Sequence, residues 1–451
     1  MCKRKDLCFV FLALFIFFSA SLFAQSNSPY SRYGLGDVAP NTNIINRGMG
    51  GISAGYSDIL SVNFNNPASY SNFKMYLEER SQKPQSGRML LDAGINIDSR
   101  TLRNPNQPQK FASTDAYFSY VQLGLPLYKN WGLSFGLRPL SRIGYKISRR
   151  ELLIDPRTDI AIDSAFTEFS GTGGSFLPSI GTGVAIKNFS VGVNMGYLFG
   201  KKENTTKRAL FNDTVSYNSS NHTTRISFGH IFFNAGAQYK INLNKQTYLR
   251  LGVAGNWQQN INASQDIIRE TFVRDVTSGD QQLDSVYEQK GLSGSILYPA
   301  SYTAGFVLER QNEKGAGWLL GADYIQNKWE NFRIFNQPDS TKNNWQLRVG
   351  GQFRSQPARN YFSNVAYRAG FFVGPDYINV YNKLPQFGIT FGAGLPITNY
   401  NRLSPNQFTI VNLSFEYSRR GNNNNILKED LFRISVGFNF SDVWFRKPRY
   451  D

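Results

Sequence analysis

Alternation of apolar and polar side chains dominates the chain from about residue 87 onward. In the stretch WQLRVGGQFR, Trp345, Leu347 and Val349 share one face, whereas Gln346 and Arg348 lie on the other. Side chains that alternate between two faces are typical of a β-strand. The pattern predicts about fourteen strands: 87–98, 115–128, 131–146, 163–187, 189–202, 222–242, 246–262, 299–310, 316–327, 344–356, 361–374, 386–396, 407–419 and 430–441.

The predicted strands are long, and their apolar faces are rich in aliphatic and aromatic residues. Many runs reach ten residues or more, which is enough for a tilted strand to cross a bilayer, whereas strands of soluble proteins usually have about five or six. The apolar face would pack on a second sheet in a soluble sandwich, but it contacts lipid in a membrane barrel. We therefore predict an all-β fold, a transmembrane antiparallel barrel over residues 87–445, followed by a periplasmic tail, 446–451.

The predicted connections alternate in length, as in a barrel with long outer loops and short periplasmic turns. The long ones follow the odd strands: 99–114, 147–162, 203–221, 263–298, 328–343, 375–385 and 420–429. The longest contains QDIIRETFVRDV, which could form a short helix over the mouth of the barrel. In the third strand, Pro139 has no N–H to donate, which predicts a kink or bulge there.

The first residues have the features of a secretory signal peptide. Lys3, Arg4 and Lys5 precede the apolar run LCFVFLALFIFF, and SASLFAQ then offers small residues with a cleavage point after Ala24. This pattern predicts a signal peptide over residues 1–24 and export from the cytoplasm.

Residues 25–86 have neither a helical nor a strand period. They include the glycine-rich stretch RGMGGISAGYSDILSVNFNNPASYSNF, from Arg47 to Phe73. Irregular backbone is tolerated at membrane depth only where protein or water surrounds it. We therefore predict that residues 25–86 form a plug, or hatch, inside the barrel lumen.

Composition excludes several classes of function. The net charge is +17, from 49 Lys+Arg against 32 Asp+Glu; export makes nucleic acid an unsuitable partner, so anionic lipid, lipopolysaccharide or an anionic solute is expected instead. Both cysteines, Cys2 and Cys8, lie in the signal peptide, and the two histidines, His222 and His230, have no nucleophile motif nearby. We predict no catalytic residue, no metal site and no cofactor, and hence no enzyme.

Several stretches occur in an order that is similar to one known family. They are the Gly-Met-Gly-Gly turn at 48–51 followed by Asn66-Pro67-Ala68; LYPASYTAGFVLERQNEKGAGWLLGADYIQNKWENF (297–332); NWQLRVGGQFRSQPARNYFSNVAYRAGFFVGPDYI (344–378); and LPQFGITFGAGLPI. In this order they resemble the FadL-like outer-membrane transport family for long-chain fatty acids and other hydrophobic compounds. The resemblance covers most of the mature chain.

The resemblance implies a fourteen-stranded outer-membrane barrel, plugged by its N-terminal segment, that takes up hydrophobic or amphipathic small molecules passively. Ligand would leave sideways into the bilayer through a gap at the kinked third strand when the hatch shifts. The implied gate residues are Asn66, Pro67, Ala68, Gly50 and Gly51. The implied kink residues are Arg138, Pro139, Leu140, Ser141 and Arg142.

Two questions stay open at this point. Lumen-side arginines such as Arg250, Arg348 and Arg354 could hold an anionic ligand head group, or they could pair with acidic residues and with the plug. The family also has relatives that act in protein secretion, so the alternative function is an accessory barrel that binds a partner protein at its outer loops. A continuous apolar pocket under residues 263–298 would favour transport, whereas a packed lumen with an apolar outer patch would favour the accessory role.

Overall fold

The computed structural model describes residues 28–77, 84–154, 157, 161–212, 217–275, 279–313, 315–380, 382–397 and 408–444. The predicted signal peptide (1–24) and C-terminal tail (446–451) lie outside these residues. Both therefore stay predictions, as does the division into a plug at 25–86 and a barrel at 87–445.

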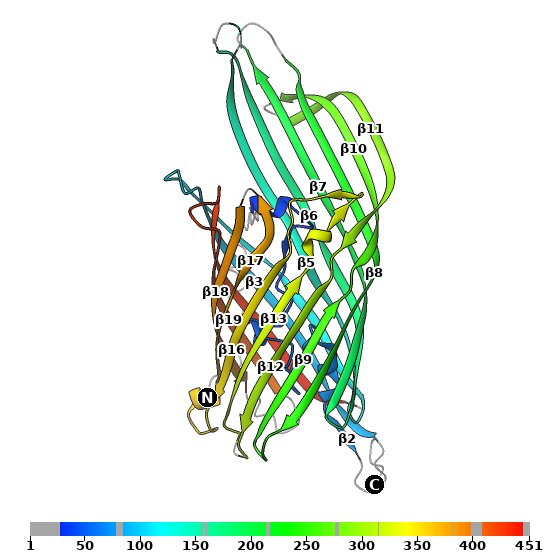
Figure 1. Cartoon of the computed structure of the whole chain (residues 1–451), viewed down its shortest axis with the longest axis vertical. Coiled ribbons are helices and arrows are strands. Elements are labelled where there is room, and N and C mark those ends of the chain that lie inside the picture. The colour runs from blue at the N-terminus through cyan, green and yellow to red at the C-terminus, as the bar shows by residue number, and fades with distance from the viewer. Residues whose placement is uncertain are drawn as a thin grey trace, which may run out of the picture.

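The wall of the protein is one antiparallel sheet that closes on itself, because β20 pairs with β3 (Figure 1). Within the described residues it has fourteen strand positions, so the predicted fold class is confirmed. Two of these positions are each made of two consecutive strands, β9 with β10 and β11 with β12. The strands are β3 (Pro84–Arg103), β4 (Lys110–Tyr128), β5 (Trp131–Ile154), β6 (Ala161–Ile186), β7 (Phe189–Phe211), β8 (Ser219–Asn242), β9 (Thr247–Asn256), β10 (Gln259–Asp275), β11 (Gly279–Tyr298), β12 (Ser301–Gln311), β13 (Gly317–Asn327), β16 (Asn344–Arg354), β17 (Ala366–Val380), β18 (Asn382–Ile397), β19 (Phe408–Arg420) and β20 (Lys428–Trp444).

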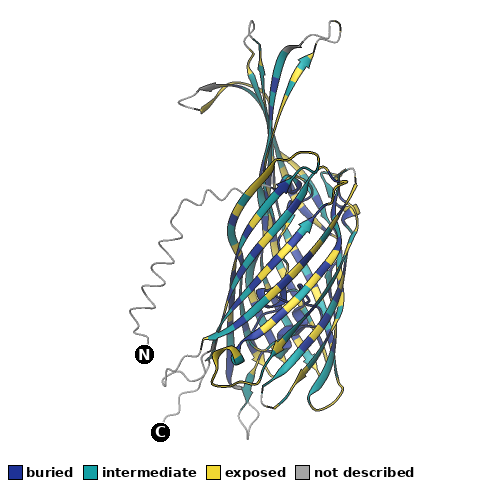
Figure 2. Ribbon diagram, turned by 90° about the vertical axis from the view of Figure 1, so that its left-hand side faces the viewer, coloured by how far each residue is buried: buried dark blue, intermediate teal, exposed yellow. Residues whose placement is uncertain are grey.

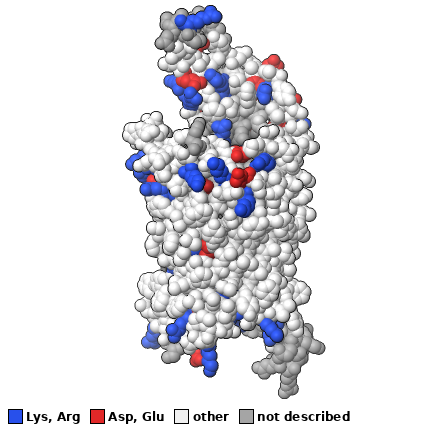
Figure 3. Space-filling view, viewed as in Figure 1, with Lys and Arg blue, Asp and Glu red and all other residues white. Residues whose placement is uncertain are grey.

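Apolar side chains of the barrel strands point outward and polar ones point inward. On β7, Val191 and Met195 are 46% and 47% exposed, whereas Ser190 and Asn194 are 8% and 5% exposed. Figure 2 shows this alternation along the strands, and Figure 3 shows that charged residues gather above and below a largely uncharged middle. An outward apolar band on a closed barrel is the arrangement that lipid requires, and the protein is an outer-membrane barrel.

No helix among the described residues is long and apolar enough to cross a membrane. Turns at one end of the barrel are short, such as 129–130 and 187–188. Short turns are periplasmic in bacterial barrels, so we call this the periplasmic end and the opposite one the outer end.

On one side of the barrel the sheet continues past the outer rim (Figure 1). We call this extension the outer sheet; it comprises residues 145–154, 161–170, 203–211, 219–226, 266–275 and 279–292 of β5–β8, β10 and β11. The outer connections predicted at 147–162, 203–221 and 263–298 are therefore wrong in extent, because most of their residues are paired strand. Both faces meet water beyond the membrane, so the apolar–polar contrast that identifies a strand in the sequence is lost there.

The short helix predicted in QDIIRETFVRDV is also wrong. Residues 265–275 of this stretch belong to β10, which pairs with β8 from Ala263 to Phe272 and with β11 along its length. Neighbouring strands on both sides satisfy the backbone donors and acceptors of β10. Tertiary pairing thus outweighs the local helical preference of this stretch.

The N-terminal segment, defined here as residues 28–73, lies inside the barrel (Figure 1, dark blue). Its regular pieces are short because no neighbouring strand runs beside most of it. They are η1 (Pro29–Arg32), β1 (Asp37–Val38), α2 (Ile44–Arg47) and η2 (Pro67–Asn72), followed outside the segment by β2 (Met75–Leu77), which pairs with β3.

A second irregular stretch, residues 328–343, covers the lumen at the outer end; we call it the mouth cap. It contains η3 (Trp329–Asn331), β14 (Arg333–Ile334) and β15 (Gln337–Pro338). A further 3-10 helix, η4 (Tyr361–Asn364), lies outside the cap and precedes β17. Apolar side chains of the cap pack with those of the segment: Trp329 and Phe332 join Tyr30, Leu35 and Phe232 in one buried cluster. The outer mouth is thus filled by side chains.

Candidate functional site

Two rows of glycines in the wall let the N-terminal segment approach the sheet closely. Gly350 and Gly370 lie opposite each other on β16 and β17. A Cβ added at Gly350 would lie 2.1 Å from the Met49 carbonyl oxygen, and one at Gly370 would lie 2.2 Å from the Gly50 nitrogen. Any larger residue at these positions would displace the segment, so this row forms a fitted seat for Met49 and Gly50.

The second row lies on the opposite part of the wall, nearer the periplasmic end. Gly183, Gly192 and Gly236 are paired across β6, β7 and β8. An added Cβ at Gly192 would lie 2.4 Å from the Pro67 carbonyl carbon, and one at Gly236 would lie 2.1 Å from Asn66 Oδ1. This row seats the Asn66-Pro67 corner.

Hydrogen bonds then fix the residues that the sequence proposed as a gate. Asn66 Nδ2 donates to the Ala54 carbonyl oxygen at 2.7 Å, and Asn66 Oδ1 accepts from the Ala68 nitrogen at 3.2 Å, which caps η2. Gly50 and Gly51 adopt φ values of 69° and 86°, which glycine reaches without strain. These residues are brought together with the wall, but their role in gating stays a prediction.

The third barrel strand, β5, has a bulge at the predicted kink. Its register with β6 shifts between Pro139 and Ser141. On its other side, β5 pairs with β4 only as far as the Val121–Leu137 pair. Toward the outer end the described residues of β4 and β5 are not paired with each other, so the wall has a lateral separation there.

The N-terminal segment occupies the free edge of β5 along this separation. Asp37 and Val38 of β1 pair with Arg142 and Ser141. Further along, the Ser28 nitrogen donates to the Gly144 carbonyl oxygen at 2.9 Å. The predicted kink residues are therefore held by the segment itself, which acts as an additional strand at this point.

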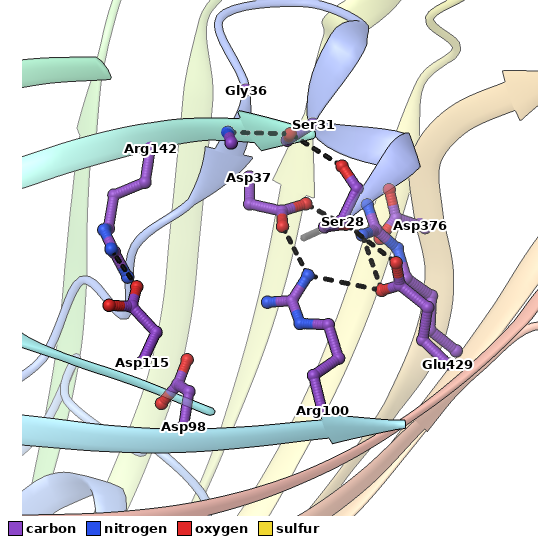
Figure 4. A network of polar contacts seen from close by, with 12 residues as sticks. Ser28, Ser31, Gly36, Asp37, Asp98, Arg100, Asp115, Arg142, Asp376 and Glu429 are labelled. Carbon is purple, nitrogen blue, oxygen red and sulfur yellow. Dashed lines mark hydrogen bonds and ion pairs between the residues drawn. The ribbon is translucent and has the colours of Figure 1, made fainter. Parts of the chain in front are cut away.

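A buried network of charges anchors the same part of the segment (Figure 4). Asp37 accepts from Arg100 at 2.6 Å and from Arg420 at 2.9 Å, and Ser28 Oγ donates to Glu429 at 2.7 Å. Arg420 also lies 2.7 Å from Asp376. Burial raises the pKa of the Asp37 carboxyl, but the two arginines lower it by more, so the net pKa lies below its ordinary value.

Above the segment lies a cavity of about 320 Å³ whose lining is polar and apolar in nearly equal parts. Among the described residues, seven arginines and five carboxylates line it: Arg47, Arg100, Arg138, Arg142, Arg348, Arg420 and Arg433 with Asp37, Asp98, Asp376, Glu416 and Glu429. Arg433 pairs with Asp98 and Glu416, and Arg142 pairs with Asp115. The lumen therefore presents charge to any occupant of this space.

The three arginines proposed as head-group ligands are not brought together. Arg348 lines the cavity, but its guanidinium donates to the Gly51 carbonyl oxygen at 3.0 Å and to Gln346. Arg250 donates to the Ser57 carbonyl oxygen, and Arg354 lies at the periplasmic end of β16. Two of the three thus hold the segment, and a ligand role for any of them stays a prediction.

Sequence reasoning missed the glycine rows, the Asp37 network and the mouth cap. The glycines carried a usable signal, because many of them occupy lumen-facing positions in strands whose apolar and polar residues alternate. The network carried none, since it joins Asp37, Arg100 and Arg420 across more than 300 residues of chain.

Solved structures of similar fold include a FadL homologue from Pseudomonas aeruginosa, at 14% identity over 92% of this chain and 100% of that one, with a TM-score of 0.49. The toluene transporter TodX of Pseudomonas putida is 14% identical over 90% and 100% of the two chains, with a TM-score of 0.49. The toluene transporter TbuX of Ralstonia pickettii is 11% identical over 90% and 98%, with a TM-score of 0.46. At these identities the similarity to the FadL-like family stays a resemblance.

No curated protein matches this chain in sequence. A protein-family model, described as BamG, matches residues 1–451, which is the whole chain. Because the match spans the whole chain, the chain belongs to the BamG family.

Proposed function

We propose that this protein is a closed outer-membrane barrel that binds a partner protein through its outer sheet, as an accessory in protein secretion or assembly. The observation that carries the proposal is the outer sheet itself, which continues six strands beyond the rim while the other side of the barrel stays short. For example, β6 has 26 residues, whereas β13 and β16 have 11 each. Crossing a bilayer needs only about 9–11 residues per strand.

The state of the lumen supports this proposal over passage of a hydrophobic ligand. The N-terminal segment is seated against two glycine rows, and the mouth cap packs on Tyr30 and Leu35 of the segment. The cavity between them has seven arginines and five carboxylates beside its apolar lining, and an apolar solute that filled it would desolvate these charges. An apolar pocket under residues 263–298 would have favoured transport. Ile261 and Ile296, in or beside this stretch, are instead buried in the cluster at the mouth, so neither side chain lines an open apolar pocket.

The outer sheet exposes apolar side chains where no bilayer covers them. Leu283 and Val286 of β11 are 52% and 66% exposed, and Leu152 of β5 is 68% exposed. Exposed apolar groups outside the membrane are typical of surfaces that bind proteins. The lipopolysaccharide contact expected from the sequence stays a prediction for this region.

The membrane-facing wall offers a second apolar feature. Gly351 and Ala369 are paired across β16 and β17, with Leu320 on one side and Phe391 on the other. The small residues form the floor of a groove that these larger side chains flank. A lumen occupied by the N-terminal segment and the mouth cap, together with such an outer groove, favours an accessory barrel.

Site-specific photo-cross-linking in living cells tests the proposal. A photoreactive residue at Val286 should yield an adduct with one protein, whereas the same residue at Val253, on the lipid-facing wall, should not. Replacing residues 270–286, which include Val286, by an Asn-Gly turn should lower the amount of other folded barrels in the outer membrane. If Val286 gives no adduct, or if the shortened protein is folded and the amount of other barrels does not change, the accessory proposal is wrong.

A second candidate function is the one that the family resemblance implies: uptake of hydrophobic compounds with lateral exit. The observation that favours it is the unpaired stretch between β4 and β5, which the N-terminal segment alone occupies among the described residues. Release of β1 from β5 would open that side of the wall.

A reversible lock distinguishes this candidate. Val38 and Ser141 are register partners, at a separation that suits a disulfide. With Val38→Cys and Ser141→Cys, oxidation should stop uptake of radiolabelled hexadecanoate and reduction should restore it. The matched control, Ala237→Cys with Val253→Cys, joins two strands that are already paired. Equal uptake by the oxidised and reduced lock would contradict lateral exit past β1.

A further inference from the structure

Three arginines in the lumenal cavity, Arg47, Arg138 and Arg348, have no ion pair with a carboxylate among the described residues, and of these only Arg47 and Arg138 have a buried nitrogen without a hydrogen-bond partner. Arg138 is on β5 beside the bulge, and Arg47 is on α2 of the N-terminal segment. Both line the cavity of about 320 Å³, a volume within the range of small-molecule sites. They are 6% and 4% exposed, so both are more than nine-tenths buried.

Neither guanidinium has its donors fully used. Arg138 Nη1 has no hydrogen-bond partner, and its Cζ lies 5.0 Å from the centre of the Phe64 ring. Arg47 donates to Asn96 Oδ1 at 2.7 Å and to the Pro40 carbonyl oxygen at 3.2 Å, while its Nε is unpartnered. Every acceptor that these two arginines use is therefore neutral.

Most other arginines of the cavity show a different arrangement. Arg100, Arg420 and Arg433 each lie within 4 Å of at least one carboxylate. The lining as a whole has seven arginines and five carboxylates. A buried charge without a partner is strongly unfavourable. Arg47 and Arg138, which have neither an ion pair nor a full set of hydrogen bonds, therefore mark a place where an anion is missing.

We propose that this cavity binds an oxyanion, a carboxylate or a phosphate group, with Arg47 and Arg138 as its cationic contacts. The planar guanidinium fork matches carboxylate and phosphate oxygens, because its N–H groups donate in parallel to two oxygens. Leu140, Phe232 and Trp329 also line the cavity and give an apolar surface to the remainder of such a molecule. The ligand is thus either a free anion or the head of a short amphipath.

Binding would join two parts of the chain that meet at the lateral separation. Arg47 belongs to the N-terminal segment and Arg138 to the wall at the bulge, and their guanidiniums lie over the rings of Tyr120 and Phe64, which are themselves 5.2 Å apart. An oxyanion between segment and wall would stabilise the seated segment. This inference requires neither the partner protein nor transport, so it goes beyond the proposed function.

Thermal unfolding of the purified full-length mature barrel in detergent tests the proposal. The probes are inorganic phosphate and octanoate, each titrated against sodium chloride at constant ionic strength. A ligand that binds only the folded state raises the unfolding temperature in a saturable way. We expect saturation with at least one probe for the wild type and for Arg354→Met, whose arginine lies outside the cavity lining, and loss of the response for Arg47→Met and Arg138→Met.

The two probes separate the two sources of the oxyanion. Saturation by phosphate alone identifies a free anion, and saturation by octanoate at lower concentration identifies the head of an amphipath. Heat-modifiable gel mobility checks that each variant is folded; where a Met variant does not fold, the Lys variant at that position should bind at least tenfold more weakly. No saturable response of the wild type to either probe, or an unchanged response after substitution of Arg47 and Arg138, would overturn the proposal.

Discussion

Neutralising Asp37 should release the N-terminal segment from β5 without unfolding the barrel. Asp37 accepts hydrogen bonds from Arg100 at 2.6 Å and from Arg420 at 2.9 Å, and its own backbone pairs with β5 at Arg142. The wall strands do not depend on these bonds, because the described barrel strands pair with one another along the sheet. The perturbation is therefore local to residues near β1.

The size of the effect follows from what remains after the substitution. Each charge-assisted hydrogen bond contributes about 1.5–3 kcal/mol. Arg100 still has Glu429 at 3.5 Å, and Arg420 still has Asp376 at 2.7 Å, so neither cation is left alone. We therefore take the lower end and expect about 3 kcal/mol for Asp37→Ala and roughly half of this for Asp37→Asn, which keeps one acceptor. Since about 1.4 kcal/mol is a factor of ten, local opening should rise roughly 150-fold and tenfold respectively.

Hydrogen exchange measured by mass spectrometry can follow this opening. The Ala39 nitrogen donates to the Leu140 carbonyl oxygen at 2.9 Å, so its protection reports on the contact with β5. The matched control is Asp430→Asn, which removes an ion pair with Arg419 on the wall and away from the segment. Unchanged exchange of Ala39 in Asp37→Ala, or an equal increase in Asp430→Asn, would refute the reasoning.

The same carboxylate predicts how protection depends on pH. Burial raises the pKa of Asp37, but Arg100 and Arg420 lower it to a net value below its ordinary value of 3.8. A carboxyl with a depressed folded-state pKa stabilises the fold above its unfolded pKa, and this contribution is lost as the pH falls through the folded value. After correction for intrinsic exchange rates, protection of Ala39 should stay flat from pH 8 to 5 and decline only below about pH 4.

Three further substitutions test how the segment and the cap are held. Gly350→Ala would place a Cβ 2.1 Å from the Met49 carbonyl oxygen, so we expect a loss of about 1–3 kcal/mol in chemical unfolding. Asn66→Asp replaces the amide that donates to the Ala54 carbonyl oxygen with a carboxylate, which cannot donate. Amide hydrogen exchange in η2 should therefore rise at least tenfold, and more than in Asn66→Ala. Trp329→Ala removes a buried ring stacked on Tyr377 at 4.3 Å and should cost about 3–5 kcal/mol, measured by the same unfolding assay.

The membrane-spanning part of the fold could be predicted from the sequence because lipid and lumen impose opposite requirements on alternate residues. In β20, Phe432 and Phe438 face outward and are 46% and 45% exposed, whereas Asn439 faces the lumen and is 4% exposed. That contrast ends at the rim. In β11 both faces from Gly279 to Ser293 are exposed, so neither period nor polarity distinguishes this strand from a loop. Most of the outer sheet was therefore predicted as loops, although its backbone is paired.

Prediction of the candidate site succeeded where a residue has a local constraint and failed where the constraint is tertiary. Pro139 cannot donate to a ladder, and a bulge does occur beside it. The unpaired charge of Arg138, one residue earlier, depends on the absence of a carboxylate around it in three dimensions. Spacing along the chain gives no information on such an absence, so Arg138 was grouped with the kink rather than with a ligand site.

One strand connects the oxyanion site, the lateral separation and the outer sheet. On β5, the bulge at Pro139 lies beside Arg138, residues 141–144 bind the N-terminal segment, and the outer sheet begins at Tyr145. Strand β5 is paired to β6 on both sides of the bulge, so these features lie on one continuous element. A protein bound at the outer sheet and an anion bound at Arg138 would therefore act on the same contact, the pairing of β1 with β5. If the lateral separation does open, that contact is where both ligands would bias it, so partner binding and uptake need not be exclusive functions of the barrel.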